Sequence, residues 1–475
     1  MQQSYNIEMT ELTGGTFWAP YTDAQILGEE PFTIDSDRGD MVKTLMALHV
    51  KVDPIDLSEP RIRAAAAALG PAIIRFSGSW ATRTYYDFDG RTGGIVPDGF
   101  DFILTAGQWQ GALDFARSVG AKILVSVANS SGVHENGTGP WQPDQAELLW
   151  NYTAAQGMTI DYAEFMNEPN MLPGMKLPDG YGLKELSRDH DLFARWLKED
   201  HPETTYVGPC SADGDRKSIQ GGSMMPLLKT RDILNGCQIM PEIFSYHSYN
   251  GISERGAMFG CHYGFDQALD EDYLSLTMDY LDFHMSIRDE FVPGAPMWIT
   301  ESADAACGGN TWAPTFAEAI RYIDEQCRFA LKTDGVIFHN TLASSAYGLL
   351  DQQSHLPRPQ YWAGLLFNRL CGERVYDTHE PLRKGLHLFA FSRADQTDGI
   401  CYVCINNSLT GPTVIDTPSG MLYMLTAPAP RSRQICLNGR PLSMTPDDTI
   451  PGLQGSPVPK GSLSLPPCSI TFLTV

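Results

Sequence analysis

The sequence predicts an α/β fold, a (β/α)8 (TIM) barrel with an accessory β-sandwich domain. Between residues 26 and 374, short apolar runs alternate with longer helical patterns, as in a parallel sheet whose strands are joined by helices. From residue 375 to 475, strand-like segments follow one another with only Gly-, Pro- and Asp-rich turns between them, which is typical of a sandwich. The 475 residues suffice for both domains.

Eight apolar runs are the predicted barrel strands, because parallel strands buried on both faces are apolar throughout. The runs are PFTID (31–35), AIIRFSGS (72–79), KILVSVAN (122–129), DYAEFMNEP (161–169), TYVGPCSA (205–212), IFSYHSYN (243–250), MWITESA (297–303) and GVIFHNTL (335–342). Helical patterns between them include 59–70, 110–121, 144–157, 317–332 and 359–372. Residues 1–25 also have strand character and are predicted to complete the sandwich.

The composition argues against some classes of binding partner. Thirty-four basic residues face 57 acidic ones, for a formal net charge of -23, and such a surface repels nucleic acid and anionic membranes. No window is apolar enough to span a bilayer. The first residues, MQQSYNIEMTELTGG, have neither the basic start nor the apolar core of a signal peptide. Oligomeric state and compartment stay open, including a periplasmic or secreted location if a leader has been removed.

The ten cysteines predict neither a metal site nor a cofactor. Cys401 and Cys404 form the single CxxC, within a predicted strand, where residues three apart face opposite sides. Buried thiols are the expected state.

Polar residues end nearly every predicted strand. In a barrel, the carboxyl ends of the strands meet at one mouth, where catalysis takes place. Glu164, by contrast, lies mid-strand and is expected inside the barrel. The residues at the strand ends are Asp35, Ser77–Ser79, Asn129, Asn167, Glu168, His247, Tyr249, Glu301, His339 and Asn340.

Two carboxylates, Glu168 and Glu301, stand out among these residues. A pair of carboxyls on either side of a glycosidic bond can hydrolyse it, provided that one is protonated and the other ionised. This hypothesis requires that both acids reach the same mouth and that neither is buried against a permanent cation. The alternatives are a helix cap for Glu168, a salt-bridged wall residue for Glu301 and a packed core pair for His247 and Tyr249.

An ordered set of motifs covers almost the whole chain. The set is TIDSD (33–37), IIRFSGSWATRTYYDFDG (73–90), FMNEPN (165–170), YVGPCSA (206–212), SYHSYNG (245–251), WITESADAACGGN (298–310), SSAYGLLD (344–351), YWAGLLFNRLCG (361–372), ICLNGRPL (435–442) and LPPCSITFL (465–473). It resembles glycoside hydrolase family 79, the heparanase and β-glucuronidase family of the clan A retaining glycosidases. The family fold, a barrel with a β-sandwich made from both chain ends, agrees with the prediction above.

The resemblance implies roles for the matching residues. Glu168 would be the general acid/base and Glu301 the nucleophile. Asn167 would hold the sugar 2-hydroxyl, and Tyr249 would hydrogen-bond the nucleophile with His247 close behind. Other positions that match contacts to sugar hydroxyls are Asp35, Ser79 and Asn129.

The resemblance also implies a receptor for a uronate carboxylate. Backbone N–H groups of Gly308 and Gly309 and the hydroxyl of Tyr347 match it, and such neutral donors can bind an anion. One departure is Cys307, which stands where the animal heparanases commonly have Tyr, in a turn that is one residue longer. Trp312 or Tyr263 could fill the space of that hydroxyl.

The leading hypothesis is therefore a retaining exo-β-D-glucuronidase that acts on a carbohydrate substrate without metal or cofactor. An endo-acting, heparanase-like enzyme is less favoured, because no basic cluster lies near the strand ends to grip a polyanion. A glycosidase for a neutral or 4-O-methylated sugar, and a catalytically silent carbohydrate-binding protein, are the remaining alternatives.

Overall fold

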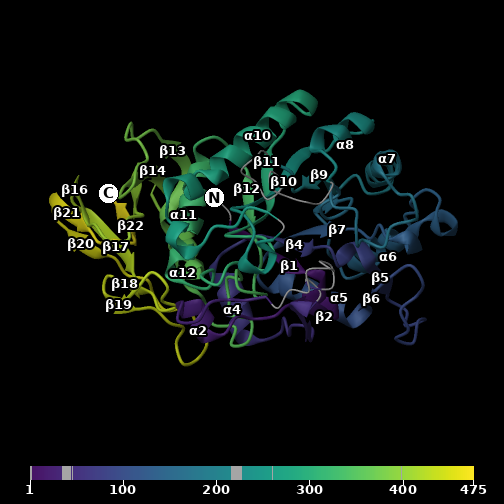
Figure 1. Cartoon of the computed structure of the whole chain (residues 1–475), viewed down its shortest axis with the longest axis horizontal. Helices are drawn as coiled ribbons and strands as arrows, with labels where there is room; N and C mark the ends of the chain where they lie inside the picture. Colours follow the sequence, from purple (N-terminus) through teal and green to yellow (C-terminus); the bar gives the residue numbers. More distant parts are fainter. Residues whose placement is uncertain (1–2, 35–43, 45–46, 215–226, 259, 397) are drawn as a thin grey trace.

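The computed structural model describes residues 3–34, 44, 47–214, 227–258, 260–396 and 398–475 (Figure 1). Eight parallel strands form a closed barrel in the order β1-β12-β11-β10-β9-β8-β7-β4, as the fold prediction requires. They are β1 (Gln3–Glu8), β4 (Ile73–Ser77), β7 (Lys122–Ser126), β8 (Tyr162–Glu164), β9 (Thr205–Ser211), β10 (Ile243–Tyr249), β11 (Met297–Ala303) and β12 (Val336–His339). Seven of the eight predicted runs are confirmed.

Helices surround this barrel. The larger ones are α4 (Pro60–Ala68), α5 (Ala106–Ser118), α6 (Asp144–Ala155), α7 (Leu183–Asp200), α8 (Thr230–Gly236), α10 (Leu276–Phe291), α11 (Phe316–Ala330) and α12 (Pro359–Leu370). Residues Phe316–Phe329 of α11 are all buried, because this helix lies between the barrel and the C-terminal sheets (Figure 1). Among the described residues, no helix has both the length and the apolar character needed to cross a bilayer.

The N-terminal segment corrects one prediction, since it belongs to the barrel and not to the sandwich. β1 pairs in parallel with β12 on one side and β4 on the other, while β2 (Gly15–Trp18) pairs with β3 (His49–Val52). The run PFTID is not a barrel strand: residues 31–34 form no regular element, and Asp35 lies outside the described residues. In β1, polar and apolar residues alternate as in a half-buried sandwich strand, yet all six are buried. Asn6, for example, donates to Thr300 O and to the side chain of Asn340.

Antiparallel sheets form the C-terminal domain. β14 (His387–Arg393), β15 (Ile400–Asn406) and β22 (Ser469–Thr474) are neighbours in the main sheet, whose first strand, β13 (Cys371–Tyr376), spans the predicted boundary at 374/375. The sheet continues through β17 (Gly420–Thr426), β18 (Cys436–Leu437) and β19 (Arg440–Pro441), with β20 (Ser456–Val458) paired to β17, and β16 (Thr413–Thr417) pairs separately with β21 (Gly461–Leu465).

The two faces of the main sheet have different neighbours. One face packs on α12, where the rings of Phe391 and Phe367 lie 5.4 Å apart. The other carries a cluster to which Leu465 of β21 contributes. Cys401 and Cys404 are buried free thiols that join different clusters, one for each face of β15, as their spacing predicted.

Candidate active site

Glu168 and Glu301 meet at one mouth of the barrel. Glu301 lies on β11, and Glu168 follows the end of β8 with a φ of 46°, a backbone conformation that is costly for residues other than Gly and is concentrated at functional sites. An oxygen of Glu168 lies within 4.8 Å of an oxygen of Glu301, and both side chains are buried. His247, from β10, joins them: its Nδ1 is 3.0 Å from Oε1 of Glu168 and 3.4 Å from Oε2 of Glu301.

Arg75, from β4, forms a buried ion pair with Glu301, so the expectation that neither acid is buried against a permanent cation is wrong for Glu301. Its guanidinium donates to Oε1 of Glu301 at 2.8 Å, and to Glu164 at 2.5 and 3.0 Å. Glu164, the last residue of β8, is buried beside Arg75, as the predicted position inside the barrel requires, so the single positive charge is shared between two carboxylates. An ionised Glu301 is therefore favoured, and its Oε2 is free of Arg75.

The two carboxyls have pKa shifts in opposite directions. Burial raises the pKa of Glu168 above its usual value, and the hydrogen bond from His247 only partly offsets this. Burial would also raise the pKa of Glu301, but His247, Arg75 and the hydrogen bond from Tyr249 outweigh burial and lower it. A proton is thus retained preferentially on Glu168.

Tyr249 and Asn340 fix the orientation of Glu301. The hydroxyl of Tyr249 donates to Oε2 of Glu301 at 2.6 Å. Nδ2 of Asn340 donates in turn to the hydroxyls of Tyr249 at 2.9 Å and of Tyr347 at 3.2 Å. His247 and Tyr249 are therefore partners of the acids and not merely a packed core pair.

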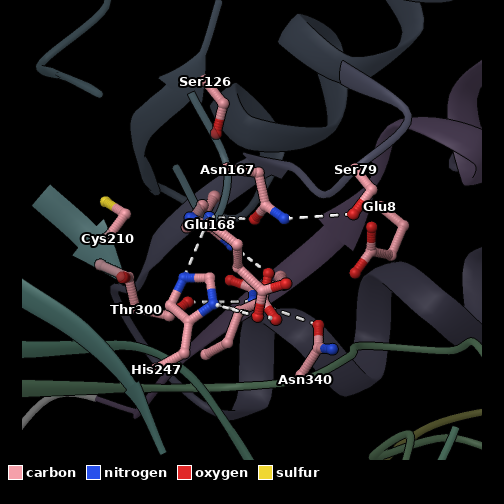
Figure 2. A network of polar contacts seen from close by, with 12 residues as sticks. Glu8, Ser79, Ser126, Asn167, Glu168, Cys210, His247, Thr300 and Asn340 are labelled. Atoms are coloured by element: carbon pink, nitrogen blue, oxygen red, sulfur yellow. Dashed lines mark hydrogen bonds and ion pairs between the residues drawn. The ribbon is translucent and has the colours of Figure 1, made fainter. Parts of the chain in front are cut away.

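Asn167 lies on the opposite side of the acids. Its Oδ1 accepts from Arg75 at 2.8 Å, which leaves Nδ2 to point to Oγ of Ser79, 3.4 Å away (Figure 2). The amide orientation is thus set by Arg75, with the donor group directed toward Ser79.

The turn after β11 contains three successive residues with positive φ, namely Cys307 (61°), Gly308 (81°) and Gly309 (80°). A Cβ on Gly308 would come within 2.6–2.9 Å of Ser345, Trp18 and Arg255, so no larger residue fits. The N–H groups of Gly308 and Gly309 donate to no described residue, whereas their carbonyls are all engaged. This turn resembles the concave arrangement of backbone donors that binds anions.

Comparison with known proteins agrees with this geometry. No family model matches the chain. Heparanase-like protein 1 of Arabidopsis thaliana is 25% identical over 89% of this chain and 85% of its own length. Heparanase of Mus musculus is 27% identical over 70% of this chain and 63% of its own length. Baicalin-β-D-glucuronidase of Scutellaria baicalensis is 24% identical over 88% of this chain and 83% of its own length.

The chain is a homologue of the heparanases and β-glucuronidases. Among solved structures, a 4-O-α-L-rhamnosyl-β-D-glucuronidase from Fusarium oxysporum superposes with a TM-score of 0.58 at 12% identity, covering 87% of this chain and 90% of that one. This likeness concerns the fold alone. Because its homologues are heparanases and a β-glucuronidase, the chain is a glycoside hydrolase. It consists of a (β/α)8 barrel and an added antiparallel sheet domain.

Two predicted polar residues of this glycosidase, Asn129 and His339, are bound by other residues of the chain. Asn129 is buried, and its amide is bound by Tyr181 at 3.1 Å and His134 at 3.1 Å. His339 is buried and bonds the carbonyl of Tyr347 at 2.7 Å, which is a structural contact. Asp35 lies outside the described residues.

Two residues of the site were missed, Arg75 and Glu8. Arg75 was read as part of the apolar run AIIRFSGS, although a charge inside such a run is itself a signal of a buried partner. Glu8 ends β1, beside Ser79 in Figure 2, and its Oε2 is buried without a hydrogen-bond partner among the described residues. Burial and then the charge of Glu301 raise the pKa of Glu8 well above its usual value.

Glu168, His247 and Glu301 also form the one described group of three acidic or imidazole side chains close enough to hold a metal ion. The guanidinium 2.8 Å from Oε1 of Glu301 would repel such an ion. The expectation of a site without a metal stays a prediction.

Proposed function

We propose that the chain is a retaining exo-β-D-glucuronidase, with Glu168 as general acid/base and Glu301 as nucleophile. The observation that carries the proposal is the close pair of carboxyls with opposite pKa shifts. Retaining glycosidases need the two carboxyl groups about 5–5.5 Å apart, and inverting ones about 6.5–9.5 Å. Oxygens of the two acids within 4.8 Å of each other agree with the shorter separation and support retention.

Two displacements would complete the reaction. Oε2 of Glu301 attacks the anomeric carbon while Glu168 gives its proton to the leaving oxygen, so that a glycosyl–Glu301 ester forms and the aglycone leaves. Glu168, now ionised, then takes a proton from water as the water attacks the same carbon and releases Glu301. His247 contacts both carboxyls and is placed to stabilise Glu168 while it is ionised.

The sugar would be held by groups on both sides of the acids. Nδ2 of Asn167 would meet the 2-hydroxyl, and Ser79 and Glu8 are the candidates for the other hydroxyls. The free N–H groups of Gly308 and Gly309, with the hydroxyl of Tyr347, would bind the C6 carboxylate. Burial raises the pKa of the Cys307 thiol to about 12, so this side chain is neutral and does not repel the anion.

The product's stereochemistry tests the proposal most directly. Hydrolysis of p-nitrophenyl β-D-glucuronide, followed by NMR, should first release the β-anomer of glucuronic acid. A 2-fluoro glucuronyl fluoride should label Glu301, and peptide mass spectrometry would locate the label. An initial α-anomer, or a label on another residue, would contradict the mechanism.

Substrate size separates exo from endo action. The relatives named heparanase favour an endo enzyme as the second candidate, while the net charge of -23 favours a short or neutral aglycone. Comparing p-nitrophenyl glucuronide with heparan sulfate decides between them, and efficient cleavage of the polymer alone would overturn the exo assignment. A matching p-nitrophenyl glucoside and a 4-O-methyl glucuronide test the preference for the sugar.

A catalytically silent binding protein is the alternative from another class. A human relative that is 24% identical is named inactive heparanase-2. Here both carboxyls, Asn167 and Tyr249 are present and connected, which disfavours that alternative. Sugar binding without turnover of any glycoside in this set would establish it.

A further inference from the structure

Arg255 is a buried cation directly behind the Gly308–Gly309 turn. It is 1% exposed and follows β10 in a single 3-10 turn (Glu254–Gly256). Its Nη1 donates to the carbonyls of Cys307 at 3.2 Å and Gly309 at 3.0 Å, and its Nη2 donates to the carbonyl of Ala19 at 2.7 Å. The guanidinium thus ties three neutral backbone groups together around the turn.

No acid neutralises this guanidinium among the described residues, where its partners are carbonyls and two aromatic rings. The guanidinium lies 3.7 Å from the ring centre of Tyr21 and 5.9 Å from that of Trp18. The adjacent Glu254 forms no ion pair with it but accepts from the backbone N–H and the hydroxyl of Thr311 at 3.0 and 2.8 Å, and from the hydroxyl of Tyr21 at 3.3 Å. A buried charge without a counter-ion is costly, so a ligand that supplies the counter-charge is expected nearby.

The turn connects Arg255 to the sugar site through a peptide group. The carbonyl of Cys307, which accepts from Arg255, and the N–H of Gly308, which donates to no described residue, belong to the same planar peptide. A cation at the carbonyl polarises that N–H and makes it a stronger donor, because hydrogen bonds in a chain strengthen one another. Nη1 of Arg255 is so close that a Cβ on Gly308 would meet it at 2.9 Å.

We propose that Arg255 is a positioning residue that determines specificity for an anionic sugar: its uncompensated charge acts through the Cys307–Gly308 peptide on the carboxylate of the substrate. This proposal rests on the proposed glucuronidase function and adds a charge to a receptor otherwise made of neutral donors. The charge of Arg255 would also attract the sugar carboxylate without the tyrosine hydroxyl that is missing at Cys307.

The test compares two substrates that differ in charge and little in shape, p-nitrophenyl β-D-glucuronide and its methyl ester. In Arg255→Gln, the ratio of kcat/KM for the acid to kcat/KM for the ester should fall about tenfold, mainly through KM, because a hydrogen-bonded charge is replaced by a neutral donor. Arg255→Lys keeps the charge and should retain the ratio within about threefold. Thermal unfolding of each variant verifies that it folds.

Arg358→Gln is the matched control. Arg358 is also buried and also donates to carbonyls, those of Ser345, Ala346 and Gly348, but Asp351 lies 3.3 Å from it and balances its charge. Its loss should lower turnover of acid and ester alike and leave their ratio unchanged.

The possible outcomes distinguish the role of Arg255 from the proposed glucuronidase function on which it rests. If the unaltered protein hydrolyses neither glucuronide nor ester, the glucuronidase function fails and this inference with it. If it hydrolyses glucuronide but Arg255→Gln keeps the same ratio, or changes it no more than Arg358→Gln does, only the role of Arg255 is overturned. If Arg255→Gln does not fold, Arg255→Lys becomes the test. A folded Arg255→Lys in which the acid-to-ester ratio of kcat/KM falls tenfold refutes the role of Arg255, and one that retains the ratio supports this role.

Discussion

Two buried ionic clusters in this molecule differ in their balance of charge. At the junction of barrel and sheet, His387 of β14 contacts Asp324 at 2.5 Å and Glu271 at 3.0 Å, and Arg328 contacts Asp324 at 2.5 Å. Two acids there face two bases. At the barrel mouth, the acids Glu8, Glu164, Glu168 and Glu301 face Arg75 and His247 as the only basic side chains among the residues that the structure describes.

The pKa shifts follow from this balance. At the junction every shift favours the charged form: the pKa of His387 is raised to about 9, because Asp324 outweighs the effect of burial, and the pKa of Asp324 is lowered. At the mouth the pKa of Glu301 is lowered, while those of Glu168 and Glu8 are raised. A balanced cluster holds two domains together, whereas an excess of acids keeps a proton available for catalysis.

Removing a carboxylate should therefore have different effects in the two clusters. Glu168→Gln and Glu301→Gln should each lower kcat/KM for p-nitrophenyl glucuronide by at least about a thousandfold, since one removes the proposed proton donor and the other the proposed nucleophile. Thermal unfolding should change little. Glu271→Gln is the control at the junction and should lower the Tm without reducing kcat/KM. Unchanged rates in either of the first two variants would remove that residue from the mechanism.

The junction should make stability depend on pH. The folded pKa of His387, about 9, is above its unfolded value near 6.5, so its contribution is fully present below pH 6.5 and is lost as the pH rises through 9. The loss should amount to about 3 kcal/mol, measured by urea unfolding at pH 6 and pH 9.5. His387→Phe should reduce the difference between the two pH values by about that amount. Glu11 and Glu318, whose pKa burial raises to about 7, also lose stability as the pH rises and account for the remainder. A difference of the same size in the wild-type protein and in His387→Phe would contradict the assignment.

A smaller change at the mouth should move the pH profile of activity. Tyr249→Phe removes the hydrogen bond that helps to lower the pKa of Glu301, so this pKa should rise. The acid limb of kcat/KM, set by ionisation of the nucleophile, should then move to higher pH, with a loss of roughly tenfold to a hundredfold at the optimum. Tyr246→Phe, on the same strand, is the control, because the hydroxyl of Tyr246 bonds no described residue. Equal profiles for both variants would exclude Tyr249 from tuning Glu301.

The sequence allowed prediction of what is encoded in single strands, but not of what depends on pairs of strands. Seven barrel runs were identifiable because each is followed by a helical pattern, as in a strand–helix unit of a parallel sheet. β1 was not, because its inward face carries Asn6 and Glu8, so that a barrel strand with a polar interior has the alternation of a sandwich strand. Glu168 and Glu301 follow apolar runs and were visible. The place of Arg75 in the site depends on its contacts with Glu164, Glu301 and Asn167, which lie on other strands or loops. No local sequence pattern indicates such contacts.

The smallest expected effect concerns Cys307, which stands in the turn between the acids and Arg255. Its thiol is neutral, and among the described residues it makes no hydrogen bond, so Cys307→Ser should change the acid-to-ester ratio of kcat/KM by less than about threefold. Cys436→Ser, in β18 of the sheet domain, provides the baseline for a thiol far from the mouth. A tenfold fall of the ratio in Cys307→Ser alone would mean that the thiol itself binds the carboxylate. Binding of the anion would then depend on this side chain and not, as argued here, on two backbone N–H groups and the charge behind them.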